Sequence, residues 1–170
     1  MSESQAEIQR RAILKSAAVL AVGQVTLSNG CLAEGSSGPA GVAKPGDFDF
    51  LAGKWKIKNR RLKNLGTSDW EEFDGESTCY TILGGAGSVE ELRIPVGKYA
   101  GMGLRLFDVE KKIWNDYWVS AKNGILTTPG QTGLFEKGVG TFIADDVDGD
   151  KPIKVKGVWD RITPDSCRWY

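Results

Sequence analysis

Turn residues divide the chain after residue 48 into short segments, roughly every 8 to 14 residues. In 54–58, Trp55 and Ile57 point to one side and the lysines to the other, the two-residue period of a half-buried strand. Similar patterns predict further strands, at 70–83, 88–94, 99–108, 113–120, 134–144, 152–162 and 166–170. No window here has the 3.6-residue period of an amphipathic helix. The pattern predicts an all-β domain over 47–170.

Short turns join successive segments, which favours neighbouring antiparallel strands. Asn123-Gly124 is typical of a β-hairpin. Such an order predicts closure into an up-and-down β-barrel of about eight or nine strands, which removes exposed sheet edges, with a two-sheet sandwich as the alternative. The acidic stretch 145–150 resembles a calcium loop, but Ala144 and Val155 would occupy its first and twelfth positions. We therefore expect a hairpin turn there and no metal.

Gly53-Lys54-Trp55 resembles the G-x-W signature of the lipocalin and wider calycin superfamily, in which the tryptophan closes one end of the barrel. A longer series resembles a bacterial calycin-like family of unassigned function, in the order "DFDFLAGKWKIKNRRL", "WEEFDG", "LRLFD", "IWNDYW", "GVGTF" and "WDRITPDSCRW". The resemblance implies a lipocalin-like barrel and supplies no catalytic residue. Members of that family continue past the position of Tyr170. We therefore expect a barrel that is incomplete at its C-terminal end, with an open sheet edge available for homo-oligomerisation.

The first residues differ from the rest. Arg10 and Arg11 precede a mildly apolar run too short to span a bilayer, and 1–33 resembles a twin-arginine export signal. An amphipathic N-terminal helix is the alternative, and Cys31 is a candidate for lipidation with a poorly matching context. Residues 34–46 are rich in Gly, Ser and Pro and predict a flexible linker. We expect a periplasmic or otherwise exported bacterial protein that meets the membrane only during export.

Charge and composition narrow the chemistry. Lysine plus arginine and aspartate plus glutamate both total 22, so the net charge favours no nucleic-acid partner. The chain has no histidine. This excludes catalytic triads built on histidine, histidine bases and histidine ligands to zinc or haem. We find no motif for a cofactor and no candidate catalytic residue that outweighs a structural interpretation.

The carboxylates and cysteines each leave two interpretations. Glu72, Asp74 and Glu76 alternate on one strand face: a solvated outer face is the simpler interpretation, and an interior acid/base pair is the alternative. Cys79 and Cys167 could pair in an oxidising compartment or remain reduced thiols.

Aromatic residues are the most informative candidates for function. Trp114, Asp116 and Trp118 share one strand face, although the pattern alone does not show which face is interior. Tryptophans of this kind fill a core or wall a binding site with a few polar groups. We predict a non-catalytic barrel that binds a small apolar or amphipathic molecule; the alternative is an isomerase, cyclase or hydrolase that uses Glu72 or Asp116. The predicted ligand-binding residues are Trp55, Tyr80, Arg105, Trp114, Trp118 and Trp159.

Overall fold

The computed structural model describes residues 42–64 and 67–170. These residues form nine strands and three short 3-10 helices. The strands are β1 (Gly53–Leu62), β2 (Trp70–Ile82), β3 (Gly87–Ile94), β4 (Tyr99–Asp108), β5 (Ile113–Ser120), β6 (Gln131–Glu136), β7 (Val139–Asp148), β8 (Lys151–Asp160) and β9 (Arg168–Trp169). The 3-10 helices are η1 (Asp49–Leu51), η2 (Leu83–Gly85) and η3 (Val96–Lys98). In the described part of the chain no helix has the length and hydropathy needed to cross a membrane.

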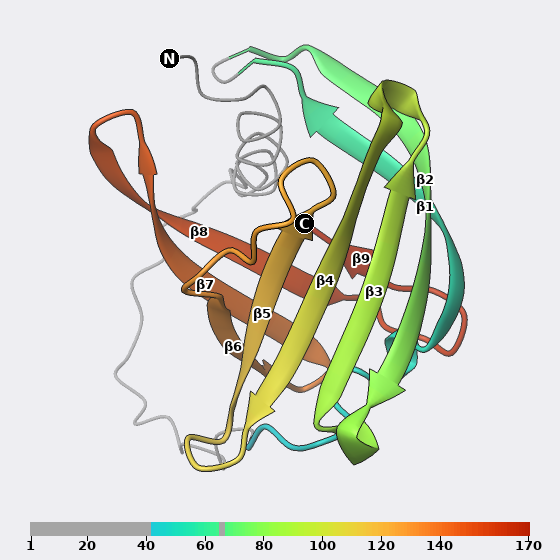
Figure 1. Cartoon of the computed structure of the whole chain (residues 1–170), viewed down its shortest axis with the longest axis vertical. Coiled ribbons are helices and arrows are strands. Elements are labelled where there is room, and N and C mark those ends of the chain that lie inside the picture. The colour runs from blue at the N-terminus through green and yellow to red at the C-terminus, as the bar shows by residue number, and fades with distance from the viewer. Residues whose placement is uncertain (1–41, 65–66) are drawn as a thin grey trace, which may run out of the picture.

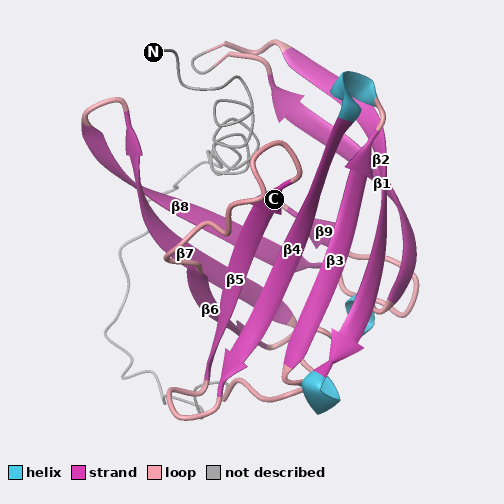
Figure 2. Ribbon diagram, viewed as in Figure 1, coloured by secondary structure: helices cyan, strands magenta, loops and turns pink. Residues whose placement is uncertain are grey.

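All nine strands belong to one antiparallel sheet, whose order follows the sequence from β1 to β9. The sheet curls into a half-barrel, with β1–β4 along one wall and β6–β8 crossing behind (Figures 1 and 2). Among the described residues β1 pairs only with β2, and β9 pairs only with β8. The all-β, up-and-down prediction is confirmed, and the barrel is open between its first and last strands.

One strand prediction was wrong. The segment 134–144 was expected as a single strand, but it contains the end of β6, a tight turn and the start of β7. Lys137 and Gly138 make the turn, both with positive φ (50° and 79°), as a type I′ hairpin turn requires at its two central residues. Lysine is not one of the residues that mark such turns, so the sequence pattern missed it. The expected hairpin at Asp148-Gly149 does join β7 to β8.

The segment before β1 packs inside the half-barrel. Ala43, Phe48 and Leu51 are buried, and the Gly46 amide donates a hydrogen bond of 2.8 Å to the Gly85 carbonyl beside β3. The last residues of the expected linker 34–46 therefore belong to the packed structure. The expected export signal, with Arg10 and Arg11, and Cys31 lie outside the described residues.

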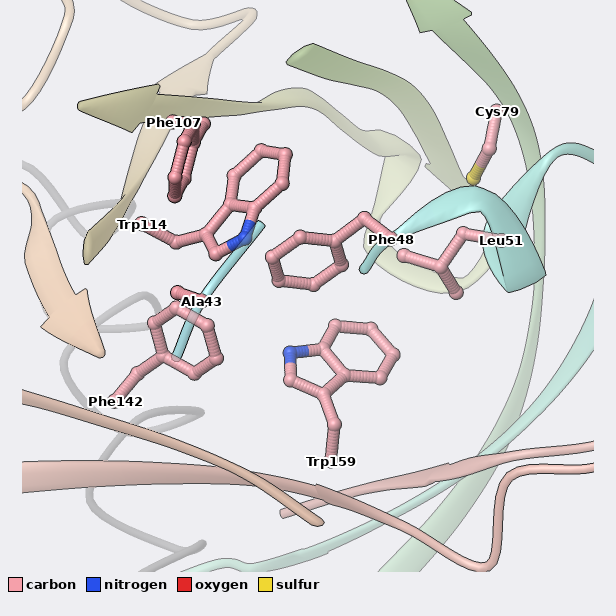
Figure 3. Packing of buried hydrophobic residues seen from close by; sticks show 8 residues of the cluster. All are labelled: Ala43, Phe48, Leu51, Cys79, Phe107, Trp114, Phe142 and Trp159. Atoms are coloured by element: carbon pink, nitrogen blue, oxygen red, sulfur yellow. The ribbon is translucent and has the colours of Figure 1, made fainter. Parts of the chain in front are cut away.

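Phe48 is the centre of the hydrophobic core. Its ring contacts rings from four strands, and edge-on geometries predominate, as aromatic pairs prefer. Figure 3 shows Phe48 between Trp114, Phe142 and Trp159. The buried cluster consists of Ala43, Phe48, Leu51, Cys79, Phe107, Trp114, Phe142 and Trp159. The segment before β1 thus fills this part of the half-barrel, with Phe48 at its centre and the Phe50 ring packed at its edge.

Candidate functional site

Alternation along β4 and β5 defines the concave inner face of the sheet. In β4 every second residue is buried, from Tyr99 through Arg105 to Phe107. The β4–β5 register pairs Arg105 with Asp116 and Phe107 with Trp114. Because directly paired residues of antiparallel strands point to the same face, Asp116 shares the inner face with Arg105. The open question of which face of β5 is interior is thereby answered.

Arg105 is the charged side chain at the centre of this face. It is 3% exposed, although arginine is rarely buried unless it is paired. Its Nη2 donates a hydrogen bond of 2.6 Å to Glu90 Oε2, and its Nε lies 3.7 Å from Asp116 Oδ1. The guanidinium carbon is 5.3 Å and 5.2 Å from the ring centroids of Phe48 and Trp159. One guanidinium therefore joins two carboxylates to the aromatic cluster.

The guanidinium has hydrogen-bonding capacity that the described residues do not use. Nε and Nη1 of Arg105 are buried without a hydrogen-bond acceptor in the described structure, and so is Nε1 of the neighbouring Trp159. A buried donor without an acceptor costs about 1–3 kcal/mol, and more when it is charged. Native structures satisfy most such groups, so these donors indicate a place for an oxygen acceptor that the described residues do not supply.

Electrostatics fix the charge state of the arginine. Burial alone lowers the pKa of Arg105, but the charges of Asp116 and Glu90 more than offset this, and the pKa is raised. Arg105 is therefore a permanent cation. Nearby, burial raises the pKa of the Cys79 thiol to about 11, with a further contribution from Glu90. Cys79 is thus an uncharged thiol at neutral pH and does not compete for the guanidinium.

On the side of Arg105 away from Phe48, the inner face has a different lining from that of the buried cluster. Trp118 stacks on Tyr99 with an interplanar angle of 5° and donates a 3.0 Å hydrogen bond from Nε1 to the tyrosine hydroxyl. Gly101 makes room for this ring: a Cβ there would lie 2.2 Å from Trp118 Cζ2. Trp118 and Leu92 are half-buried, whereas Trp114, Phe142 and Trp159 around Phe48 are buried. This part of the face therefore offers an aromatic surface that the described residues leave partly uncovered.

The predicted ligand-binding residues fall into three groups. Trp114 and Trp159 belong to the buried cluster, and Trp55 packs against its edge and donates a hydrogen bond from Nε1 to the Leu51 carbonyl. Arg105 and Trp118 share the inner face beyond the cluster.

Tyr80 lies apart from both groups. It is 62% exposed on the opposite face of β2. The structure therefore does not bring Tyr80 together with the other predicted residues.

Three acidic residues of β2, Glu72, Asp74 and Glu76, face solvent. Glu72 and Asp74 pair with basic residues of β1: Lys58 Nζ lies 2.7 Å from Asp74 Oδ1, and Arg60 Nε lies 3.8 Å from Glu72 Oε1. Glu76 is exposed as well. The interpretation as a solvated outer face is confirmed. No group of histidine, cysteine or acidic residues suited to a metal occurs in the described ranges.

Sequence reasoning missed two residues of this site. Glu90 carries the closest contact to Arg105, yet it precedes Glu91 in a short strand, and only the strand register shows that Glu90 is the inward one. Phe48 lies within the first motif of the family resemblance, but the sequence did not indicate that its ring is the centre of the core. Of the cysteines that the structure describes, Cys79 is buried and Cys167 half-buried, and the two are not joined by a disulfide.

Comparisons with known proteins do not assign this chain to a family. No family model matches the chain, and no curated protein matches it. The argument for function therefore rests on the site.

Proposed function

We propose that this protein is a non-catalytic binding protein that holds a small apolar or amphipathic molecule on the concave face of its half-barrel. The observation that carries the proposal is the buried Arg105, whose Nε and Nη1 donors have no acceptor among the described residues. Beside it, Trp118 presents a half-buried ring. A few fixed polar groups on a mostly apolar concave surface are typical of small-molecule sites.

The fold supports this proposal. A closed barrel of about eight strands can hold one small ligand; the sheet here has the same up-and-down strand order, and the series of motifs resembles a calycin-like family. The rigid aromatic rings add contact area with few rotatable bonds, which lowers the entropic cost of holding a guest.

Ligand titration tests the proposal. A panel of fatty acids, retinoids and porphyrin-like compounds is added to the purified protein, and tryptophan emission is followed. We expect saturable quenching by at least one class, which is lost when the protein is unfolded in urea. A panel that gives no saturable binding would contradict the proposal.

The enzymatic alternative retains one candidate. Glu72 faces solvent, whereas Asp116 lies on the inner face beside Arg105. Turnover of any bound compound by the wild type, abolished in Asp116→Asn with binding retained, would replace the binding proposal by an enzymatic one.

We also propose that the protein is exported by the folded-protein route, from the twin arginines Arg10 and Arg11. Replacing both by lysine should leave the protein in the cytoplasm of a bacterial host, as shown by cell fractionation. Normal periplasmic accumulation of the variant would contradict this part of the proposal.

A further inference from the structure

We infer that the site around Arg105 selects a ligand whose polar head is an uncharged hydrogen-bond acceptor, such as an amide or ketone oxygen, and discriminates against a carboxylate head. The inference rests on the proposed binding function and names the chemistry of the ligand.

The first step concerns the available donors. An arginine side chain carries five N–H groups and no acceptor. Nη2 of Arg105 donates a hydrogen bond to Glu90, whereas Nε and Nη1 have no acceptor in the described structure. A ligand that satisfies them must present oxygen lone pairs.

The second step concerns charge. Glu90 and Asp116 both lie within ion-pair distance of the single guanidinium, at 2.6 Å and 3.7 Å. With both carboxylates ionised, one positive charge faces two negative charges. A ligand carboxylate would add a third negative charge at a place where burial leaves little solvent to screen it. A carbonyl oxygen accepts the same hydrogen bonds without this repulsion.

The third step concerns access. The side chains of Glu90 and Asp116 are 12% and 20% exposed, whereas that of Arg105 is 4% exposed. The two carboxylates are therefore more exposed to solvent than the guanidinium that they hold. An incoming head group meets the negative charges before it meets the donors, which strengthens the discrimination against anions.

Three planar probes that differ only in the head group test this inference on the full-length protein: naphthalene, 2-naphthamide and 2-naphthoate. Equilibrium dialysis near pH 7 gives each dissociation constant. We expect naphthamide to bind at least about tenfold more tightly than the other two, the effect of about one hydrogen bond to a charged group. In Asp116→Asn, which keeps the side-chain volume and removes one negative charge, we expect the preference over naphthoate to shrink severalfold.

The control is Asp74→Asn on the outer face, which removes the same charge where the carboxylate pairs with Lys58. It should leave all three dissociation constants unchanged. Equal binding of naphthamide and naphthalene would mean that ordered water alone satisfies the donors. Tightest binding of naphthoate would mean that the site prefers anions. Either result overturns the inference and leaves the proposed binding function standing. If none of the three probes binds while the retinoids or fatty acids do, the inference is also overturned. Failure of every compound overturns the proposed function itself.

Discussion

The two halves of the concave face follow the same strand alternation and yet are built differently. Around Phe48 large rings from several strands meet, and Trp114 and Phe142 are 0% and 1% exposed. Beyond Arg105 the inner face carries Gly101 and Gly103, and Trp118 is half-buried. One half is filled by a segment that inserts from outside the sheet, whereas in the other Gly101 leaves room for the Trp118 ring. Arg105 stands at the boundary, paired on one side and lying over aromatic rings on the other.

Removing the inserted ring gives the strongest test of the packed half. We expect Phe48→Ala to lower the free energy of unfolding by about 3–5 kcal/mol, the usual cost of deleting a buried phenylalanine side chain. Urea denaturation measures this value. Val42→Ala, at a side chain 71% exposed in the same segment, is the control and should change stability little. Similar losses in both variants would show that Phe48 is not the centre of the core.

Removing the positive charge of Arg105 tests its role at the boundary between the two halves. Arg105→Met leaves Glu90 and Asp116 without their partner, and we expect a loss of about 3 kcal/mol, because breaking a buried ion pair strands a charge. Adding Glu90→Gln to this variant should recover part of the loss. Arg60→Met, on the exposed outer face, should cost less than about 1 kcal/mol. A stability of Arg105→Met equal to that of Arg60→Met would contradict the buried cluster.

Two glycines of β4 sharpen the contrast within the less filled half. A Cβ at Gly101 would lie 2.2 Å from the Trp118 ring and 2.8 Å from the Val119 carbonyl oxygen, so Gly101→Ala must displace the indole. We expect a loss of about 1–3 kcal/mol, typical of overpacking. At Gly103 the nearest atoms, the side-chain ends of Arg105 and Glu90, are 3.3 Å away, so Gly103→Ala should cost less. Thermal unfolding ranks the two, and the reverse order would contradict the placement of Trp118.

The smallest expected effect is a pH dependence from Cys79. Burial raises the pKa of its thiol from 9.0 to about 11. The folded protein then keeps this proton while the unfolded chain loses it, so the thiol reduces stability as the pH rises from about 9 to about 11. Unfolding curves of the wild type and Cys79→Ala should have a constant difference at neutral pH and converge above pH 9. A constant difference throughout would show that the thiol titrates normally.

Much of the fold could be predicted because strand alternation and turn residues are local signals. The strand from Gly53 and the outward position of Glu72 follow from them. The Lys137-Gly138 turn could not be predicted in this way. Lys137 adopts a positive φ there, and lysine is not one of the residue types that indicate such a turn. The site was harder to predict. Arg105 and Trp118 stand out by residue type, but the pairing of Arg105 with Glu90 depends on a register between two strands that only the folded sheet defines.

Binding by two tryptophan variants tests the central claim, that a small molecule binds on the concave face beside Trp118. Trp70 starts β2 on the outer face, where Arg60 lies over its ring, and it supplies the matched control. With retinol as the probe and tryptophan emission as the signal, Trp118→Ala should weaken saturable binding about tenfold, and Trp70→Ala should leave it unchanged. Equal affinities in the two variants, or no saturable binding to the wild type, would contradict the account.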